Sequence, residues 1–366
     1  MKISLTGPDS HRLERRPGVG VVVIGPEGGT PRPDLVVAPG DAIDWSVFDP
    51  FTVPAGYPWP RRIVYDGDDT GFFRWAGRRP IETFDWRPRA AHAVDAAAAD
   101  IGTLGITLRD APLRLTLPAA RGHVMVTGDP HLLVPDLAPG AACPGLSFAP
   151  DTRPGPGRPP LRLPDLPALA GAHSVRVTVP PLRQPFDCAS LLQFPELRTL
   201  TLSGGLANVD ALGGLRRLTA LHLQLCPDLT GLPAVDAWPD LTRLFASDVD
   251  AVVGKRLRGH GTVTRLRRPE WFAAGHGLPF AGWPSRTGKA ATAAYRAAEQ
   301  AIGAATTRQD VEAAVRGFVG AVNALPGIET TEREDAGEAV HRLTATTPCG
   351  DLTEAAARWF DEVRDF

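Results

Sequence analysis

Leucines recur in the middle of the chain at positions that match from one repeat to the next. Matching positions lie 21 and then 23 residues apart. Within a repeat, two apolar positions such as Leu221 and Leu223 are separated by one residue, and this alternation predicts a short strand with one buried face. The residue between them, His222, is then expected on the opposite face. The repeated positions are Leu197, Leu200 and Leu202, then Leu218, Leu221 and Leu223, then Leu241, Leu244 and Ala246.

The segment that leads into the middle repeat has a different period. Its apolar residues follow one another at steps of three: Val209, Leu212, Leu215 and Leu218. Every third residue of a 3₁₀ helix points to the same side, so this spacing predicts 3₁₀ or turn-like backbone before the strand.

The middle repeat fits a known sequence frame. The pattern L-x-x-L-x-L-x-x-C-x-x-L is filled by Leu218, Leu221, Leu223, Cys226 and Leu229. It resembles the signature of the leucine-rich repeat family, from Phe194 to about Leu257. The resemblance implies a leucine-rich-repeat-like parallel β solenoid. With the helical spacing of the C-terminal part described below, the expected fold class is α/β, such a solenoid with a C-terminal α-helical bundle. The resemblance also implies a structural role for Cys226, at the position where the family has Asn or Cys. The third repeat departs from the frame at Ala246 and Val249, which indicates that the array is ending.

Short β-type pieces precede and follow the leucine pattern at roughly repeat-length intervals. We interpret them as one right-handed solenoid over residues 61–265, after an N-terminal β/cap region over 1–60. The alternative is a separate β domain from 1 to about 150 followed by a short array. A proline-rich stretch from Pro150 is either a linker or an insertion loop. The pieces centre on Ile63, Phe84, Ile106, Val124, Leu146, Val175, Leu200, Leu221, Leu244 and Val263.

The N-terminal region combines two strand-like runs, residues 19–24 and 35–37, with glycine and aromatic segments. The glycines between the runs match neither nucleotide-binding pattern, so a plain turn is expected. The aromatic residues that follow are expected to cap a core, although they could line a pocket. They are Trp45, Phe48, Tyr57 and Trp59.

The C-terminal part changes to helical spacing. Residues 266–286 are expected to form an aromatic cap or linker that contains Trp271, Phe272, Phe280 and Trp283. Residues 287–366 carry four stretches with apolar spacings of three and four, which predict a helical bundle. Thr307 with Asp310 and Thr331 with Glu334 are the predicted N-terminal capping pairs. The predicted bundle core contains Val311, Val315, Phe318, Val322, Trp359 and Phe360. The plan of repeats plus a helical tail ending in WFDEVRDF is also similar to uncharacterised bacterial repeat proteins, some of which are labelled gliding-motility protein.

Composition excludes several classes of function. The net charge of -2 argues against a surface built for nucleic acid or anionic membrane. No apolar run is long enough for a membrane-spanning helix and the N-terminus lacks the plan of a secretion signal, so a cytoplasmic location is the default expectation. The separated cysteines Cys143, Cys188, Cys226 and Cys349 indicate neither a zinc site nor a disulfide framework.

Two groups of side chains have residue types that could bind a metal. His123, Asp129 and His131 have a spacing that could hold a metal ion, but a strand and its following turn more simply separate them. The acidic residues Glu329, Glu332, Glu334 and Asp335 stand where a helix begins, and carboxylates are favoured there by the helix dipole. We therefore predict no metal, no cofactor and no catalytic residue.

The expected function follows from the leucine-rich repeat resemblance. In that family the concave sheet presents the residues between the core leucines, which implies a non-enzymatic module for a protein or peptide partner. The predicted partner-binding residues are Arg176, Thr201, His222, Gln224, Arg243 and Phe245. The alternative is an enzyme of unknown class, with a site in the N-terminal region or beside the helical tail. Self-association remains a third possibility, since the sequence leaves the oligomeric state open.

Overall fold

The computed structural model describes residues 1–15, 19–29, 31–53, 55–119, 122–152, 159–345, 347 and 352–365. The chain folds into two compact units. The first comprises Met1–Thr152, Pro159–Val179 and Pro185–Leu266. The second includes Pro180–Gln184 and Arg267–Phe366, so it draws a short segment from between two strands of the first. Cys349 lies outside the described residues.

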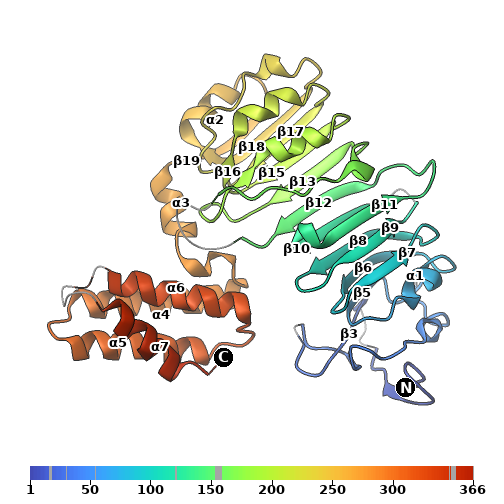
Figure 1. Cartoon of the computed structure of the whole chain (residues 1–366), viewed down its shortest axis with the longest axis horizontal. Coiled ribbons are helices and arrows are strands. Elements are labelled where there is room, and N and C mark those ends of the chain that lie inside the picture. Colours follow the sequence, from blue (N-terminus) through green and yellow to red (C-terminus); the bar gives the residue numbers. More distant parts are fainter. Residues whose placement is uncertain are drawn as a thin grey trace. The chain divides into compact units, whose positions relative to one another are not determined.

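The first unit is built on one long sheet (Figure 1). Within the described residues it has twelve strands, and neighbouring strands from β4 to β18 all run parallel. From one edge to the other the strands are β4 (Leu35–Val36), β3 (Val21–Gly25), β5 (Arg62–Asp66), β6 (Ile81–Arg87), β8 (Ile101–Leu108), β10 (His123–Gly128), β12 (Gly145–Pro150), β13 (Ser174–Thr178), β15 (Thr199–Ser203), β17 (Ala220–Gln224), β18 (Arg243–Asp250) and β19 (Thr262–Arg267).

These strands confirm the predicted β pieces, which all fall in this single sheet. Alternate side chains of each strand enter one continuous core, because successive residues of a strand point to opposite faces. In β17 the core positions are Leu221 and Leu223, both fully buried. The leucine pattern and the earlier, less regular turns therefore build the same sheet.

Short strands and 3₁₀ helices cover the other side of this core. The strands β7 (His92–Asp95), β9 (Leu113–Leu117) and β11 (Leu133–Leu137) form a second parallel sheet. Two small pairs are parallel β14 (Phe186–Asp187) with β16 (Leu206–Ala207) and antiparallel β1 (Lys2–Ile3) with β2 (His11–Arg12). The 3₁₀ helices are η1 (Trp45–Phe48), η2 (Pro130–Leu132), η3 (Pro167–Leu169), η4 (Cys188–Gln193), η5 (Val209–Gly214) and η6 (Val235–Ala237). The helix η5 confirms the backbone predicted from leucines at steps of three.

The first unit also contains the α helices α1 (Gly71–Ala76) and α2 (Ala251–Leu257). The helix α1 packs in an aromatic cluster, where the Phe72 ring stacks on Phe84 with centroids 3.9 Å apart. Trp45, Phe48 and Trp59 are buried in the same core, as expected, whereas Tyr57 is exposed.

Cys226 confirms the structural role that the family resemblance implies. Its side chain is fully buried, and its Sγ lies 3.1 Å from the backbone oxygen of Gln224, to which it donates. The thiol thus satisfies a carbonyl where the chain leaves β17.

The second unit is helical. It contains α3 (Pro269–His276), η7 (Pro279–Gly282), α4 (Ser285–Gly303), α5 (Arg308–Asn323), α6 (Thr330–Ala345) and α7 (Thr353–Val363). Its core contains every apolar residue predicted for the bundle, and also Phe280 and Trp283 from the segment expected to form an aromatic cap.

Capping of the helices agrees with the sequence prediction at α5. The reciprocal hydrogen bonds of Thr307 and Asp310 form the predicted capping box of α5. The side chain of Thr331, the other predicted cap, lies outside the described residues, and α6 begins at Thr330. The carboxylate of Glu332 accepts from the backbone N–H of Glu329 at 3.2 Å.

A buried ion pair joins the two chain segments of the helical unit. The Arg183 guanidinium, from Pro180–Gln184, lies 2.6 Å from the Asp335 carboxylate, which also accepts from Trp283 Nε1 at 2.9 Å. The side chains of Arg183 and Asp335 are 11% and 2% exposed. Asp335 is therefore more than a carboxylate placed at the start of a helix. It is a buried charge that needs the Arg183 guanidinium as its partner.

Candidate recognition face

The predicted partner-binding residues share one face of the main sheet. We call it the polar face: it consists of the strand positions that alternate with the buried core positions. Arg176, Thr201, His222 and Phe245 are paired in register across β13, β15, β17 and β18. Arg243 lies in the preceding row, opposite Ala220, and Gln224 lies in the following row, between Ser203 and Ser247.

Exposure separates these residues into two groups. Arg176, Gln224 and Arg243 are exposed, and His222 and Phe245 are half-buried. Thr201 is 8% exposed and contributes little surface. The six positions are thus brought together as predicted, but five of them offer area to a partner.

The centre of this face combines an aromatic pair with positive charge. The rings of His222 and Phe245 meet edge to face, with centroids 6.0 Å apart. Burial lowers the pKa of His222, and the nearby charges of Arg243 and Arg176 lower it further. The surroundings of His222 therefore favour its neutral imidazole.

Neither Arg176 nor Arg243 has a carboxylate partner within the described part of the chain. Arginines near the other end of the sheet differ in this respect. Arg62 lies 2.7 Å from Asp85, and Arg89 lies 2.5 Å from Asp66. Two charges on the β13–β18 part of the face are thus left for an external group.

The polar face also holds a pair that the partner-binding prediction did not include. Nε2 of His123 and Oγ of Ser147 are hydrogen bonded at 2.7 Å across β10 and β12. Gly145 makes room for the ring, because a Cβ there would lie 2.8 Å from His123 Nδ1. Burial and the charge of Arg176 lower the pKa of His123. The alternation in the HVMV and LSF segments was the signal that could have placed both residues on this face.

In the His123–Ser147 pair an imidazole contacts a hydroxyl, as a general base contacts its nucleophile in a hydrolytic site. The other groups of such a site are not present beside the pair among the described residues. A third group that orients the imidazole is part of such sites. The described residues give His123 no carboxylate partner, and Ser147 is 7% exposed. The pair extends the polar face toward β10.

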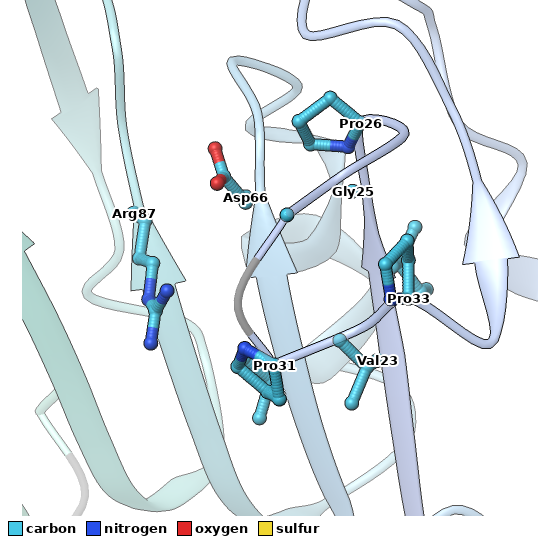
Figure 2. A pocket seen from close by; sticks show the side chains of 10 residues that line it. Val23, Gly25, Pro26, Pro31, Pro33, Asp66 and Arg87 are labelled. Carbon is cyan, nitrogen blue, oxygen red and sulfur yellow. The ribbon is translucent and has the colours of Figure 1, made fainter. Parts of the chain in front are cut away.

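The glycine-rich turn after β3 is structural. Figure 2 shows the small pocket beside it, with Gly25, Pro26, Pro31 and Asp66 around the opening. Its volume of about 10 Å³ holds at most one water molecule. This agrees with the plain turn expected from the sequence.

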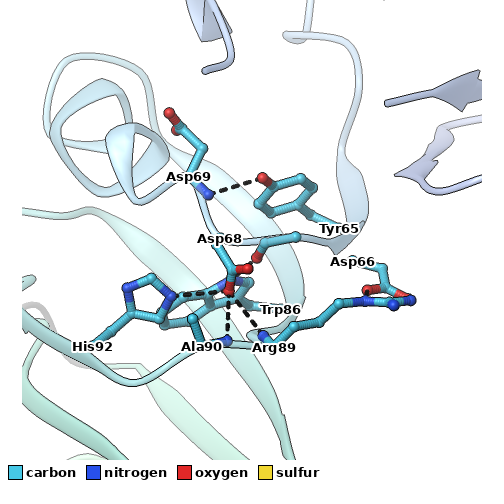
Figure 3. Close-up of polar contacts among 9 residues, drawn as sticks. Tyr65, Asp66, Asp68, Asp69, Trp86, Arg89, Ala90 and His92 are labelled. Atoms are coloured by element: carbon cyan, nitrogen blue, oxygen red, sulfur yellow. Dashed lines mark hydrogen bonds and ion pairs between the residues drawn. The ribbon is translucent and has the colours of Figure 1, made fainter. Parts of the chain in front are cut away.

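A second polar cluster, after β5, serves the loop that leads into β7 (Figure 3). The Asp68 carboxylate accepts from the backbone N–H groups of Arg89 and Ala90 and contacts His92 Nε2 at 3.0 Å. Burial acts to raise the pKa of Asp68, but these hydrogen bonds outweigh it and the pKa falls below its usual value. Tyr65 accepts the neighbouring Asp69 N–H on its hydroxyl. Asp68 and Tyr65 thus fix the backbone of these loops, and His92 pairs with Asp68.

His123, Asp129 and His131, the first group considered as a metal site, make other contacts. His123 bonds Ser147, whereas Asp129 accepts from the backbone N–H of His131 and caps η2. Among the described residues no group of three or more His, Cys, Asp or Glu side chains has a metal-binding arrangement. Within the same residues, no helix combines the length and apolar character needed to cross a membrane.

Comparison of the chain with protein-family models, with curated proteins and with solved structures gives no match.

Proposed function

We propose that the chain is a leucine-rich-repeat-like solenoid whose polar face, over β13 to β18, binds a protein or peptide partner. The frame around Leu221 and Cys226, the 3₁₀ helix η5 and the parallel strands support the repeat interpretation. The observation that carries the binding function is that Arg176 and Arg243 present exposed guanidinium groups, without a carboxylate partner among the described residues, on the same face as the His222–Phe245 ring pair.

The dimensions of the face suit an extended segment of polypeptide. Strands in a sheet are spaced about 4.8 Å apart, so Arg176 and Phe245, three strands apart, are separated by about 14 Å. An extended peptide covers that span with about four residues. Arginine and aromatic side chains contribute most of the binding energy at many protein interfaces. A partner segment with one acidic and one apolar side chain would satisfy both kinds of group.

The experiment compares capture of partners from native cell lysate by the intact chain and by Arg243→Glu/Phe245→Ala. The matched control is Arg74→Glu, an exposed arginine on α1 that is outside the polar face. A protein retained by the intact chain and by the control, and lost from the double variant with unchanged thermal unfolding, supports the proposal. Equal retention by all three would refute it.

Peptide display gives an independent readout. Panning a random peptide library on the intact chain should enrich sequences with an acidic residue near an apolar one. Arg176→Gln should weaken the selected peptides by about ten-fold or more, since a charge-assisted hydrogen bond is worth about 1.4 kcal/mol or more. Selected peptides that bind this variant unchanged would exclude the β13–β18 face as their site.

A further inference from the structure

A pocket near η1 and α1 in the first unit is built unlike the polar face. It has a volume of about 450 Å³, within the range of small-molecule sites. Its lining combines apolar side chains with two arginines and one aspartate. The lining residues are Asp49, Phe51, Thr52, Pro58, Arg78, Arg79 and Pro80. None of these residues belongs to the recognition face proposed above.

Arg79 is the unusual member of this lining. It is 8% exposed, and its guanidinium lies over the Trp75 ring, 4.9 Å from the centroid. Nη2 donates to the backbone oxygen of Trp59 at 2.6 Å, whereas the buried Nη1 has no hydrogen-bond acceptor among the described residues. A buried donor on a charged group without an acceptor is costly, so such groups normally have a partner.

Charge around the pocket is predominantly positive. Arg78 is exposed at the pocket wall, and Arg15 donates to the backbone oxygen of Thr52 at 2.6 Å while lying over the Phe51 ring. Asp49, the carboxylate among the described lining residues, accepts from Trp75 Nε1 at 2.7 Å. Burial lowers the pKa of Arg79 more than the Asp49 charge raises it. Asp49 thus compensates the buried guanidinium incompletely.

We infer that this pocket binds a small organic anion, whose carboxylate or phosphate is held by the positive charge of Arg78 and Arg79 and whose apolar part lies against Phe51 and Pro58. The anion supplies counter-charge beyond that of Asp49, the carboxylate among the described lining residues. Arg78 adds long-range attraction at the entrance, and the apolar walls favour an aromatic or aliphatic substituent over a bare inorganic ion. The inference does not depend on the function of the polar face.

Titration calorimetry on the full chain at low salt tests it with three probes of similar shape. Benzoate and phenyl phosphate carry the two candidate anionic groups, and benzamide is the neutral control. At least one anion should bind with a Kd of about 1 mM or below, with benzamide about ten-fold or more weaker. The stronger of the two anions identifies the preferred group. Absence of binding by both anions, or equal binding of benzamide, overturns the inference.

Variants locate the site. Arg79→Met should weaken the anion about ten-fold or more, because it removes the charge and keeps the apolar stem. Arg74→Met, a nearby exposed arginine outside the lining, should stay within about two-fold, the size of a distant screened charge. If Arg79→Met does not fold, Arg78→Met replaces it and should weaken binding about three-fold. An unchanged Kd in the folded lining variant overturns the assignment.

Discussion

Loss of the Arg183 guanidinium should destabilise the helical unit in a pH-dependent way. Arg183→Met removes the 2.6 Å partner of Asp335, a carboxylate that burial already gives a raised pKa despite the arginine. Breaking a buried ion pair by removing one partner typically costs about 3–5 kcal/mol. The hydrogen bond from Arg183 to the backbone oxygen of Pro279 is lost as well.

Protonation of Asp335 sets a ceiling on this cost. An unfolded aspartate has a pKa of about 3.9, so neutralising it costs about 4 kcal/mol at pH 7 and about 1.5 kcal/mol at pH 5. A raised pKa in the folded state means that stability is greatest below the unfolded pKa and falls as pH rises through the folded pKa. In Arg183→Met the folded pKa rises further, so the loss of stability should grow from pH 5 to pH 7.

Urea unfolding followed by helical circular dichroism at pH 5 and pH 7 measures this difference. Arg296→Met, which breaks an exposed pair with Glu299, is the matched control and should cost about 0.5 kcal/mol or less at both pH values. Arg183→Met/Asp335→Asn should recover most of the loss, since the amide oxygen can still accept from Trp283. A loss below about 1 kcal/mol at pH 7, or an equal loss at both pH values, would refute the reasoning.

Three further predictions concern the first unit. In Arg176→Gln the pKa values of His123 and His222 should both rise, because the variant lacks the positive charge that disfavours each imidazolium in the native chain. NMR titration of the ring protons measures both pKa values. Gly145→Ala should cost about 1–3 kcal/mol in urea unfolding, because the new Cβ would lie 2.8 Å from His123 Nδ1, and His123→Ala should relieve most of that cost. Burial raises the pKa of Cys226 to about 12, so at pH 8 its reaction with a disulfide reagent should be about a thousand-fold slower in the native chain than in urea.

Each of these has a clear contrary result. Unchanged histidine titrations in Arg176→Gln would show that the guanidinium is directed away from both rings. Equal destabilisation by Gly145→Ala with and without His123 would place the cost in the backbone rather than in the ring contact. Rapid labelling of native Cys226, tested with the other cysteines replaced by serine, would contradict its burial.

The sequence predicted the periodic parts of the fold well, for a physical reason. Apolar alternation reports directly which strand positions are buried, so Leu221 and Leu223 locate β17 and the polar-face position between them. The same logic placed Arg176 in one row with Thr201, and the strand register confirms it. Helical spacing predicted the bundle core equally well, including Phe318.

Features that depend on distant segments could not be predicted from the sequence. Asp335 looked like a carboxylate at a helix start, because nothing nearby in the chain indicates Arg183 as its partner. The role of Arg79 was equally unpredictable, since its burial results from packing against Trp75 and Trp59. The second sheet of short strands was also missed, although Leu113, Leu115 and Leu117 alternate in β9, because its strands lie between the β pieces that recur at repeat-length intervals.

The helical unit is built from separate segments of the chain, and this affects which fragments can fold and when the unit folds during synthesis. A fragment that starts at Arg267 contains the long helices α4 to α7 but lacks Arg183, so it would bury Asp335 without its counter-charge. During synthesis the Pro180–Gln184 segment leaves the ribosome well before α6 has been made. Arg183 therefore has no Asp335 to pair with while the strands before and after it form the sheet. The helical unit therefore finishes folding last, and it needs the preceding part of the chain to do so.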